Sequence, residues 1–559
     1  MNPFLRSTYA DAIAHLAERY GEREALLFAG RHYSFADIKR ESDQAAARLA
    51  ALDLPLGSKV AIWMTNRPEF IWYWFGAAQL GLVAVLLNTR LRRTELSYQI
   101  AQSDSAVIIV PGRPSFRDFL GELVQICPEL ATRSAGQLNS AQFPALRVAI
   151  ACDPPPATWP GVLDWSQSYS RLLGSKPATD ANAPATILYS SGTTALPKGA
   201  MLSHCFWRKA HDAGGRLDLS QNDCLYLSVP LFGVMGSLGG ILTLWSRGGR
   251  VVLAERFDAD ACVEALIAER CTVLHLLPAM IDVLAAHSRY KEVVNMGVLR
   301  TGVALTNNPA ALLRIAEELL IRGVVTSYGM TELTGPATRS RWDEPLETRI
   351  ETQGTPLPDV SIRVVDPDTG LDVPVGSEGE IWIGGYSVMI GYYNKPEETL
   401  RSITPDGYLK SGDLGVLNAD GTLKFLRRLK DGYKHKGFNV SIPEVEAVAS
   451  KYPNLAAVAV VGVPDQLYGE IGVAFVVPRV EGALETDLLV EYMSQRLASY
   501  KVPSHIFAVA ALPVTGGTEK IQKFKLRKLA MKFLANAGAA GNERRSAGTV
   551  PTASNKSDP

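Results

Sequence analysis

The sequence predicts an α/β fold with a large N-terminal domain of mixed α/β sheets, a β-rich subdomain and a small α+β C-terminal domain. Three observations support this prediction. Short apolar runs alternate with stretches of helical periodicity over residues 9–328. From Val360 the pattern changes to short β-like runs separated by turns, and beyond residue 440 strand and helix patterns alternate again in a smaller unit.

The first hundred residues begin this alternation. Helical periodicity covers residues 9–20 and 34–52, and buried strands are predicted at residues 59–64, 82–87 and 106–110. Strands separated by helices favour parallel sheets that are covered on both faces.

The alternation continues after a region, residues 130–176, that we interpret as loops around one strand at 147–150. Further strands are predicted at residues 185–189, 249–253, 272–276 and 324–328, and helices at 258–270 and 310–320. The β-rich part has predicted strands at residues 361–365, 380–383 and 422–425.

The C-terminal unit has predicted helices at residues 444–451 and 486–497 and strands at 457–463 and 473–477. We therefore predict an N-terminal domain at residues 1–428, a C-terminal domain at 429–535 and a disordered tail at 536–559, which is rich in Ala, Gly, Ser and charge.

Composition narrows the function classes. The 559 residues hold 57 Lys and Arg against 57 Asp and Glu, so bulk charge favours no nucleic-acid partner. The six cysteines lack Cys-x-x-Cys spacing and are interpreted as free thiols of a reducing compartment. The start of the sequence has no signal-peptide pattern, and the uncharged stretches 70–87 and 224–246 are broken by Gly or Pro, so we expect no transmembrane segment and a cytoplasmic location.

A loop rich in small hydroxyl residues follows the strand predicted at 185–189. It includes Ser190, Ser191, Gly192, Thr193, Thr194 and Lys198. Hydroxyls and backbone N–H groups can surround phosphate oxygens, and Lys198 adds a positive charge. A flexible linker is the alternative, but linkers rarely follow a buried strand or end in Pro-Lys-Gly. The common phosphate loop ends in Gly-Lys-Ser/Thr, whereas here the glycine follows the lysine, so another nucleotide-binding family is indicated.

A second stretch, Tyr328-Gly329-Met330-Thr331-Glu332, follows a predicted strand and is expected to form a loop. Its aromatic ring can stack on a base, its hydroxyl can bind a phosphate and its carboxylate can hold Mg²⁺. Taken alone, such a pentapeptide more often marks an ordinary strand end.

Two later stretches also carry polar groups. Asp413 stands between glycines and can accept hydrogen bonds from ribose hydroxyls, although Asp-Gly sequences usually mark surface turns. The basic cluster with Arg428, Lys430 and Lys434 fits either a solvated face or a hinge between domains, and Lys520 lies at the tip of a Gly/Thr loop.

Together, these four stretches resemble the adenylate-forming, AMP-binding enzyme superfamily, which includes the acyl-CoA synthetases, in order and spacing from about residue 9 to residue 529. The resemblance implies a mobile C-terminal domain and a reaction in two steps. A carboxylate attacks the α-phosphorus of ATP to give acyl-AMP and pyrophosphate, and a thiol, expected to be that of coenzyme A, then displaces AMP.

The resemblance also implies roles for single residues. Residues 190–198 would hold the β and γ phosphates, Thr331 the α-phosphate and Glu332 the Mg²⁺ ion. The adenine and acyl pocket would include Gly302, Val303, Ala304, Tyr328, Gly329 and Met330, and the ribose would be bound by Asp413 and Arg428. Lys520 would be the catalytic lysine of adenylation, Lys430 the hinge residue, and Lys434 and Gly437 would serve the thioester step, Gly437 giving pantetheine room to pass.

Departures from the family pattern bear on the substrate. Ala195 stands where glycine is usual in the phosphate loop, and Gly233 replaces a frequent histidine of the acyl pocket. The predicted pocket residues Phe232, Gly233, Val234, Met235 and Gly236 carry no aspartate to bind an ammonium, so amino acids are disfavoured. We expect a medium- or long-chain fatty acid, or an alicyclic or aromatic acid.

Two other function classes stay open at this point. The chain could load an acyl group onto a carrier protein rather than coenzyme A, or it could be a binding protein without catalysis. Retention of Lys198, Thr331, Glu332, Asp413 and Lys520 disfavours the second of these. The oligomeric state is open, with a homodimer as one candidate.

Overall fold

The computed structural model describes residues 2–91, 93–155, 159–165, 179–190, 197–306, 309–429, 432–435, 438–465, 468–480, 485–497, 499–514 and 521–539. The chain divides into two compact units. The larger unit comprises residues 1–411 and 416–425, and the smaller one comprises residues 412–415 and 426–559.

A seven-stranded sheet forms one half of the larger unit, and all of its neighbouring strands are parallel except for the pair β1 and β2. Its strands, in spatial order, are β14 (Gly323–Val325), β13 (Thr301–Val303), β12 (Val273–Leu274), β10 (Cys224–Leu227), β11 (Arg250–Leu253), β1 (Glu24–Phe28) and β2 (Arg31–Ser34). One buried cluster joins this sheet to the helices α9 (Ala259–Ala268), α10 (Pro278–Ala285), α11 (Tyr290–Met296) and α12 (Pro309–Glu317).

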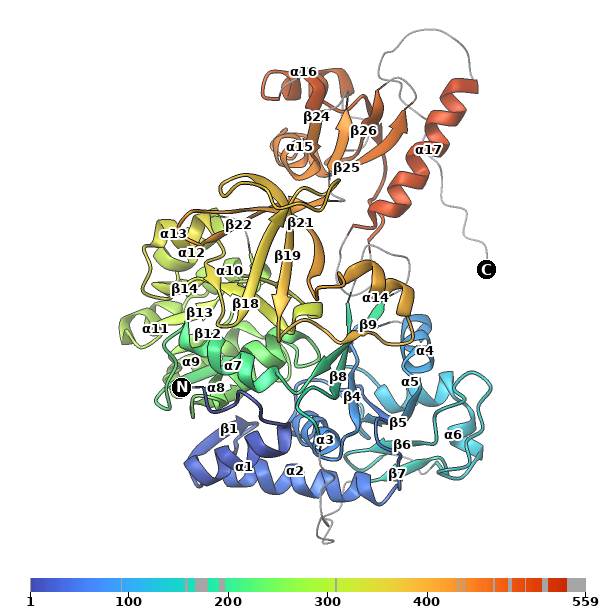
Figure 1. Ribbon diagram of the computed structural model, residues 1–559, viewed down its shortest axis with the longest axis vertical. Coiled ribbons are helices and arrows are strands. Elements are labelled where there is room, and N and C mark those ends of the chain that lie inside the picture. The colour runs from blue at the N-terminus through green and yellow to red at the C-terminus, as the bar shows by residue number, and fades with distance from the viewer. Residues whose placement is uncertain are drawn as a thin grey trace. The chain divides into compact units, whose positions relative to one another are not determined.

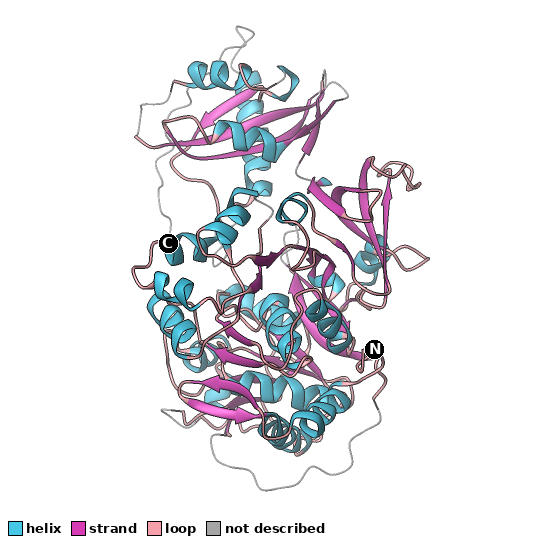
Figure 2. Ribbon diagram, turned by 90° about the vertical axis from the view of Figure 1, so that its left-hand side faces the viewer, coloured by secondary structure: helices cyan, strands magenta, loops and turns pink. Residues whose placement is uncertain are grey.

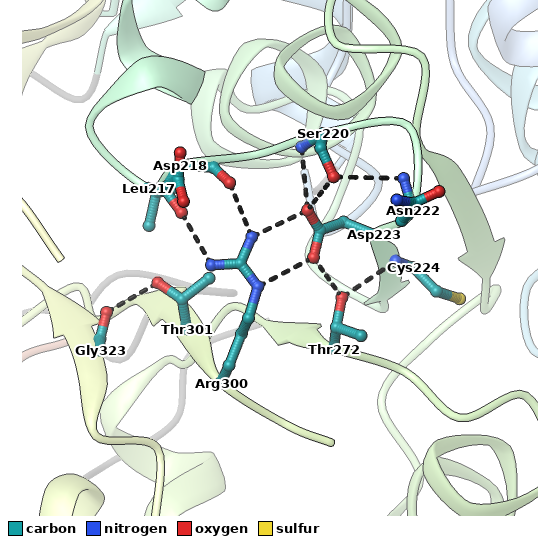
Figure 3. Close-up of polar contacts among 10 residues, drawn as sticks. All are labelled: Leu217, Asp218, Ser220, Asn222, Asp223, Cys224, Thr272, Arg300, Thr301 and Gly323. Atoms are coloured by element: carbon teal, nitrogen blue, oxygen red, sulfur yellow. Dashed lines mark hydrogen bonds and ion pairs between the residues drawn. The ribbon is translucent and has the colours of Figure 1, made fainter.

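Three of these parallel strands are tied together at their amino ends (Figure 3). Asp223 precedes β10, Thr272 precedes β12 and Arg300 precedes β13. The Asp223 carboxylate accepts hydrogen bonds from Arg300 Nε at 3.0 Å and Nη2 at 2.8 Å, and from Thr272 Oγ1 at 2.7 Å. This ion pair therefore lies at the amino ends of the strands. Ligands of parallel sheets bind at the other edge, outside the carboxyl ends.

An eight-stranded sheet forms the other half of the larger unit. Its strands, in spatial order, are β20 (Gly391–Tyr392), β9 (Lys198–Ser203), β8 (Pro184–Ser190), β4 (Val83–Leu86), β3 (Lys59–Ile62), β5 (Ser105–Val110), β6 (Val148–Ala151) and β7 (Val162–Asp164). The strands from β8 to β7 are parallel, and β9 is antiparallel to both β8 and β20.

Helices pack around these two sheets (Figures 1 and 2). They include α1 (Tyr9–Tyr20), α2 (Phe35–Ala50), α3 (Pro68–Gln79), α4 (Arg93–Gln102), α5 (Phe119–Ile126), α6 (Glu129–Thr132), α7 (Phe206–Gly215), the π-helix η1 (Met235–Leu242) and α8 (Thr243–Trp245). Thr8 and Ser34 begin α1 and α2 with reciprocal capping boxes, which satisfy the first free backbone donors. A shared core rich in tryptophan, including Trp74, Trp207 and Trp245, joins α3, α7 and α8.

Two smaller sheets follow in the chain. The three-stranded sheet has β15 (Ser327–Met330), β16 (Gly335–Arg339) and β17 (Thr355–Pro356), all antiparallel. The four-stranded sheet has β18 (Val360–Val365), β19 (Glu378–Gly385), β21 (Leu409–Leu417) and β22 (Leu423–Arg428). The helices of this region are α13 (Leu346–Glu351) and α14 (Pro396–Ser402), and a 3₁₀ turn, η2, covers Thr331–Leu333.

The smaller unit has one five-stranded sheet with helices on both faces. Its strands are β23 (Gly432–His435), β24 (Phe438–Ser441), β25 (Leu455–Asp465), β26 (Gly469–Pro478) and β27 (His505–Ala508). In Figure 1 the helices α15 (Ile442–Ala449) and α16 (Thr486–Ser494) lie on one side of this sheet and α17 (Lys523–Ala539) on the other. Each face has its own buried apolar cluster.

The predicted α/β class with a smaller α+β C-terminal part is confirmed, with corrections in detail. The region 130–176 holds a second strand, β7, besides the predicted one. The strand expected at 324–328 is two strands, β14 and β15, in different sheets. The predicted domain boundaries stay predictions. No helix among the described residues is long and apolar enough to cross a membrane.

Candidate active site

The phosphate loop predicted from the sequence joins two antiparallel strands. Ser190 ends β8 and faces Lys198, which begins β9, so the lysine belongs to a strand. Ser191, Gly192, Thr193, Thr194 and Ala195 lie outside the described residues. Ser190 Oγ is buried and has no hydrogen-bond partner among the described residues. An unpaired buried hydroxyl is costly unless a ligand or water completes it, so this atom fits a phosphate neighbour.

Lys198 is held by groups from a distant part of the chain. Its Nζ lies 3.2 Å from Oε2 of Glu398 on α14 and 4.5 Å from the ring centroid of Tyr392. Tyr392 reaches this place because β20 pairs with β9, with Tyr392 opposite Ala200. The Lys198 ammonium holds the pKa of Glu398 below its usual range.

Glu332 lies on the turn η2 and its side chain is buried. The hydroxyl of Tyr392 donates a hydrogen bond to Glu332 Oε1 at 2.9 Å. Burial, and then the neighbouring Glu332 carboxylate, raises the pKa of Tyr392, so this tyrosine stays a neutral donor. Tyr392 therefore lies between the lysine of the predicted phosphate site and the carboxylate of the predicted Mg²⁺ site.

The turn that carries Thr331 and Glu332 follows a strand directly. Tyr328, Gly329 and Met330 lie in β15 and not in the loop that the sequence predicted. A side chain at Gly329 would place its Cβ 2.2 Å from the carbonyl oxygen of Gly335, so only glycine fits between β15 and β16. One face of the Tyr328 ring packs on Phe425, with ring centroids 6.0 Å apart.

Three of the residues predicted for the acyl and adenine pocket, Gly302, Val303 and Ala304, lie at the carboxyl end of β13 in the seven-stranded sheet. Val303 ends β13, Ala304 follows it, and both are buried. At Gly302 a Cβ would lie 1.8 Å from the carbonyl oxygen of Leu274, so the backbone of β12 excludes any side chain there. The carboxyl edge of a parallel sheet is the usual place for ligands.

The other predicted wall of this pocket begins the π-helix η1. Phe232, Val234 and Met235 are half-buried and pack on the main core. A Cβ at Gly236 would meet the Pro230 carbonyl oxygen at 2.2 Å, whereas a Cβ at Gly233 would have its nearest neighbour at 3.6 Å. A Cβ at Gly335 would lie 2.8 Å from Val234 Cγ1, so this wall borders the Thr331–Glu332 turn. π-Helical turns are rare and are frequently found at functional sites.

A buried histidine connects the two walls. Val303 N–H donates to His275 Nδ1 at 3.2 Å, and His275 Nε2 lies 2.8 Å from the carbonyl oxygen of Gly239 on η1. Because Nδ1 accepts, the proton of the neutral ring must be on Nε2. Burial lowers the pKa of His275 to about 4, so the ring is neutral at pH 7.

In the smaller unit, the two residues predicted to bind ribose lie together. Asp413 is a buried residue of β21, not part of a surface turn, and Arg428 ends β22. Arg428 Nε lies 3.6 Å from Asp413 Oδ1. Lys434 lies in β23 opposite Asn439. Lys430, Gly437 and Lys520 are outside the described residues.

Tyr392, Glu398 and His275 were not found from the sequence. Glu398 is 200 positions from Lys198, and Tyr392 is 60 positions from Glu332, so no local spacing signals either contact. His275 stands within the apolar run predicted as a strand at 272–276, where a histidine is more often a satisfied core residue than a functional one, and β12 in fact ends at Leu274.

Family profiles and known proteins match most of the chain. The family profile described as AMP-binding enzyme matches residues 13–393, and the profile described as AMP-binding enzyme C-terminal domain matches residues 444–517. A medium-chain acyl-CoA ligase, ACSF2, named as mitochondrial, from Danio rerio is 31% identical over 95% of this chain and 90% of that relative.

Two further relatives cover almost the whole chain. A Mycobacterium tuberculosis CoA ligase, named for a propanoyl group on a methyl-dioxo-octahydroindene ring, is 31% identical over 93% of this chain and 99% of its own. Among solved structures, ATP-bound MatB from Rhodopseudomonas palustris matches with a TM-score of 0.77 and 26% identity, over 94% of this chain and 99% of that one.

Proposed function

The chain belongs to the AMP-binding enzyme family, and we propose that, as an AMP-forming acid–CoA ligase of this family, it activates a medium- or long-chain fatty acid or another bulky apolar carboxylic acid. The observation that carries the choice of acid is the wall formed by Phe232, Val234 and Met235, which is apolar and half-buried and has no charged side chain. The glycine at position 233 leaves room beside this wall.

The proposed reaction assigns tasks to polar groups predicted from the sequence, among which Lys520 lies outside the described residues. Lys198 and the buried Ser190 hydroxyl bind the β and γ phosphates, and Thr331 binds the α-phosphate. The carboxylate of the acid attacks the α-phosphorus, and pyrophosphate leaves. Lys520 stabilises the charge that develops between the two anions, which is where a positioned cation contributes most. Asp413 and Arg428 bind the ribose, and the thiol of coenzyme A then displaces AMP.

Glu332 is proposed as the protein ligand of Mg²⁺. Among the described residues there is no group of three or more His, Cys, Asp or Glu side chains that could hold a metal ion. Mg²⁺ does not need one, because it is usually bound through one or two carboxylates together with substrate phosphates and water. A single buried carboxylate therefore fits this ion, which would neutralise charge on the phosphates. The cytoplasmic location remains a prediction.

A fused-ring acid is the second candidate substrate. The Mycobacterium tuberculosis relative, which is 31% identical, is named for such an acid. A rigid bicyclic acid and a fatty chain of eight to twelve carbons both need an apolar pocket without a counter-charge, so the same wall would serve either.

The acid class can be tested at Gly233. Gly233→Phe should fill the space beside the apolar wall, so pyrophosphate release should fall about tenfold or more with octanoate, dodecanoate and cyclohexanecarboxylate and much less with propanoate. Gly233→Ala adds a Cβ at ordinary contact distance and is the matched control, with little change expected. Equal losses on short and bulky acids, or a wild-type preference for acetate, would contradict the proposed acid class.

A further inference from the structure

Lys209, on helix α7, is a fully buried lysine of the larger unit. Its Nζ donates a hydrogen bond to the carbonyl oxygen of Leu333. No carboxylate among the described residues lies within ion-pair distance of this ammonium group. The carboxylate of Asp212, one turn further along α7, instead accepts from Asn2 Nδ2 at 2.9 Å and Tyr386 Oη at 3.3 Å. A buried ammonium without a counter-ion is costly, so a gain elsewhere must offset it.

The acceptor of this hydrogen bond belongs to the candidate active site. Leu333 is the last residue of η2, directly after Thr331 and Glu332. The same turn is held from its other side, where Met389 N–H donates to the Glu332 carbonyl oxygen at 2.8 Å and Thr334 Oγ1 donates to the Ser387 carbonyl oxygen at 3.1 Å. Lys209 ties the turn to helix α7 through the Leu333 carbonyl oxygen, and Cys205, which precedes the first residue of that helix, places its Sγ 3.7 Å from Thr334 Oγ1.

The turn needs these ties because its end is strained. Thr334 has φ of 54°, a left-handed conformation that β-branched residues rarely adopt. A turn in this conformation persists only where its surroundings hold it. With methionine in place of Lys209, the Leu333 carbonyl oxygen would lose a buried donor and the turn would be free to relax.

We infer that Lys209 is a positioning residue that holds the Thr331–Glu332 turn through the Leu333 carbonyl oxygen, so that hydroxyl and carboxylate are in place before MgATP binds. This inference rests on the proposed function. Groups arranged in advance bind more tightly because less ordering occurs on binding. Without Lys209, Glu332 would still accept the hydrogen bond from Tyr392. Loss of Lys209 should therefore weaken MgATP binding without abolishing it.

The tie does not depend on the charge of the lysine. Burial, and to a lesser degree the neighbouring buried Arg339, lowers the pKa of Lys209 to about 7. Both the ammonium and the neutral amine carry N–H donors, so the hydrogen bond to Leu333 is available on both sides of neutral pH.

The test is calorimetric binding of ATP to the full chain, with Mg²⁺ and with a chelator. Lys209→Met keeps a flexible side chain of similar length and removes the donor. It should weaken MgATP binding by up to about tenfold, the upper range for the loss of one ordinary hydrogen bond. It should weaken metal-free ATP binding less, because the Glu332 contribution requires the ion.

Two further variants separate positioning from general destabilisation. Phe206→Leu, a buried change on the same helix, should lower the thermal midpoint and leave both ATP affinities unchanged. Lys209→Gln keeps an N–H donor one bond shorter and should give an intermediate affinity. The inference is overturned if Lys209→Met binds MgATP like the wild type, if Phe206→Leu shows the same loss, or if Lys209→Gln is no better than Lys209→Met. Absence of MgATP binding by the wild type would overturn the proposed function together with the inference.

Discussion

At the scale of single residues, His275 is a buried titratable group that stabilises the fold when its ring is neutral and destabilises it when the ring is protonated. The neutral ring donates through Nε2 to Gly239 and accepts at Nδ1 from Val303. Protonation of Nδ1 would place a second donor against the Val303 N–H group and would bury a charge. The proposed pocket for the carboxylic acid substrate therefore depends on a neutral His275 ring.

The stability of the protein should depend on this histidine in acid. Burial lowers the folded-state pKa of His275 to about 4, whereas the unfolded chain has a histidine pKa of about 6.5, so between these pH values the unfolded state binds one more proton. The contribution is fully present above about pH 6.5 and is lost as the pH falls through about 4. Relative to His275→Gln, the wild type should lose on the order of 3 kcal/mol of unfolding free energy between pH 7 and pH 4.

Urea unfolding at several pH values measures this difference. His32→Gln is the matched control, since the His32 side chain is 62% exposed. A gap between wild type and His275→Gln that stays constant with pH would show that the ring does not titrate as described.

The candidate site residues that could be predicted are those that lie in one short stretch of sequence with a recognisable pattern. Thr331, Glu332 and Ser190 stand next to strand patterns, and Asp413 stands between glycines. Lys209 and Leu333 are 124 positions apart, and their contact depends on how α7 packs against the turn. No periodicity in the chain signals such a contact, so it could only be found in the folded structure.

At the scale of elements, the amino ends of β10, β12 and β13 depend on one ion pair (Figure 3). Asp223 is 4% exposed and Arg300 is 31% exposed. Burial alone would raise the pKa of Asp223, but the hydrogen bonds from Arg300 and Thr272 outweigh burial and lower this pKa. Arg300 also donates to the carbonyl oxygens of Leu217 and Asp218, so the pair holds the strand starts and the preceding loop together.

Asp223→Asn should therefore destabilise the larger unit by about 3 kcal/mol, at the low end for a broken buried pair because Arg300 keeps some contact with water. The affinities for MgATP and acid should not change, since the pair lies at the sheet edge opposite to the candidate site. Thermal and urea unfolding measure the loss. Asp218→Asn is the control, because Asp218 contributes only its backbone carbonyl oxygen. Equal stability of the two variants would rule out the proposed role of the pair.

Elements with strong local signals were predicted well, and those defined by pairing were not. Helix α1 has the predicted bounds, and capping boxes mark the starts of α1 and α2 in the sequence itself. Many strands had no predicted counterpart: β1, β2, β7, β9, β10, β13, β16, β17, β20, β21, β23, β24 and β27. Strand β9 begins with Lys198 and Gly199, which do not favour strands, and it forms because β8 and β20 pair with it on both sides.

At the scale of the whole molecule, the two units each bury their own apolar clusters. The clusters of the smaller unit draw only on residues 433–534, which lie within the α+β domain predicted from the sequence. The division could be predicted from the sequence because strand and helix patterns alternate in both domains and are separated by a stretch of short β-like runs. The proposed acyl pocket draws on residues 232–236 and 302–304, which are far apart in the sequence, so strand and helix patterns alone do not predict that they meet.

The central claim is that this chain joins a bulky apolar acid to coenzyme A with formation of AMP. Its most direct test is mass spectrometry of acyl-CoA and AMP after incubation of the full chain with ATP, Mg²⁺, coenzyme A and one acid at a time. Lys520→Ala, which should lose pyrophosphate release, is the control. We predict equal amounts of AMP and acyl-CoA with octanoate, dodecanoate or a ring-bearing acid, and little product with acetate. A preference for acetate, or acyl-AMP without any CoA thioester, would contradict the account.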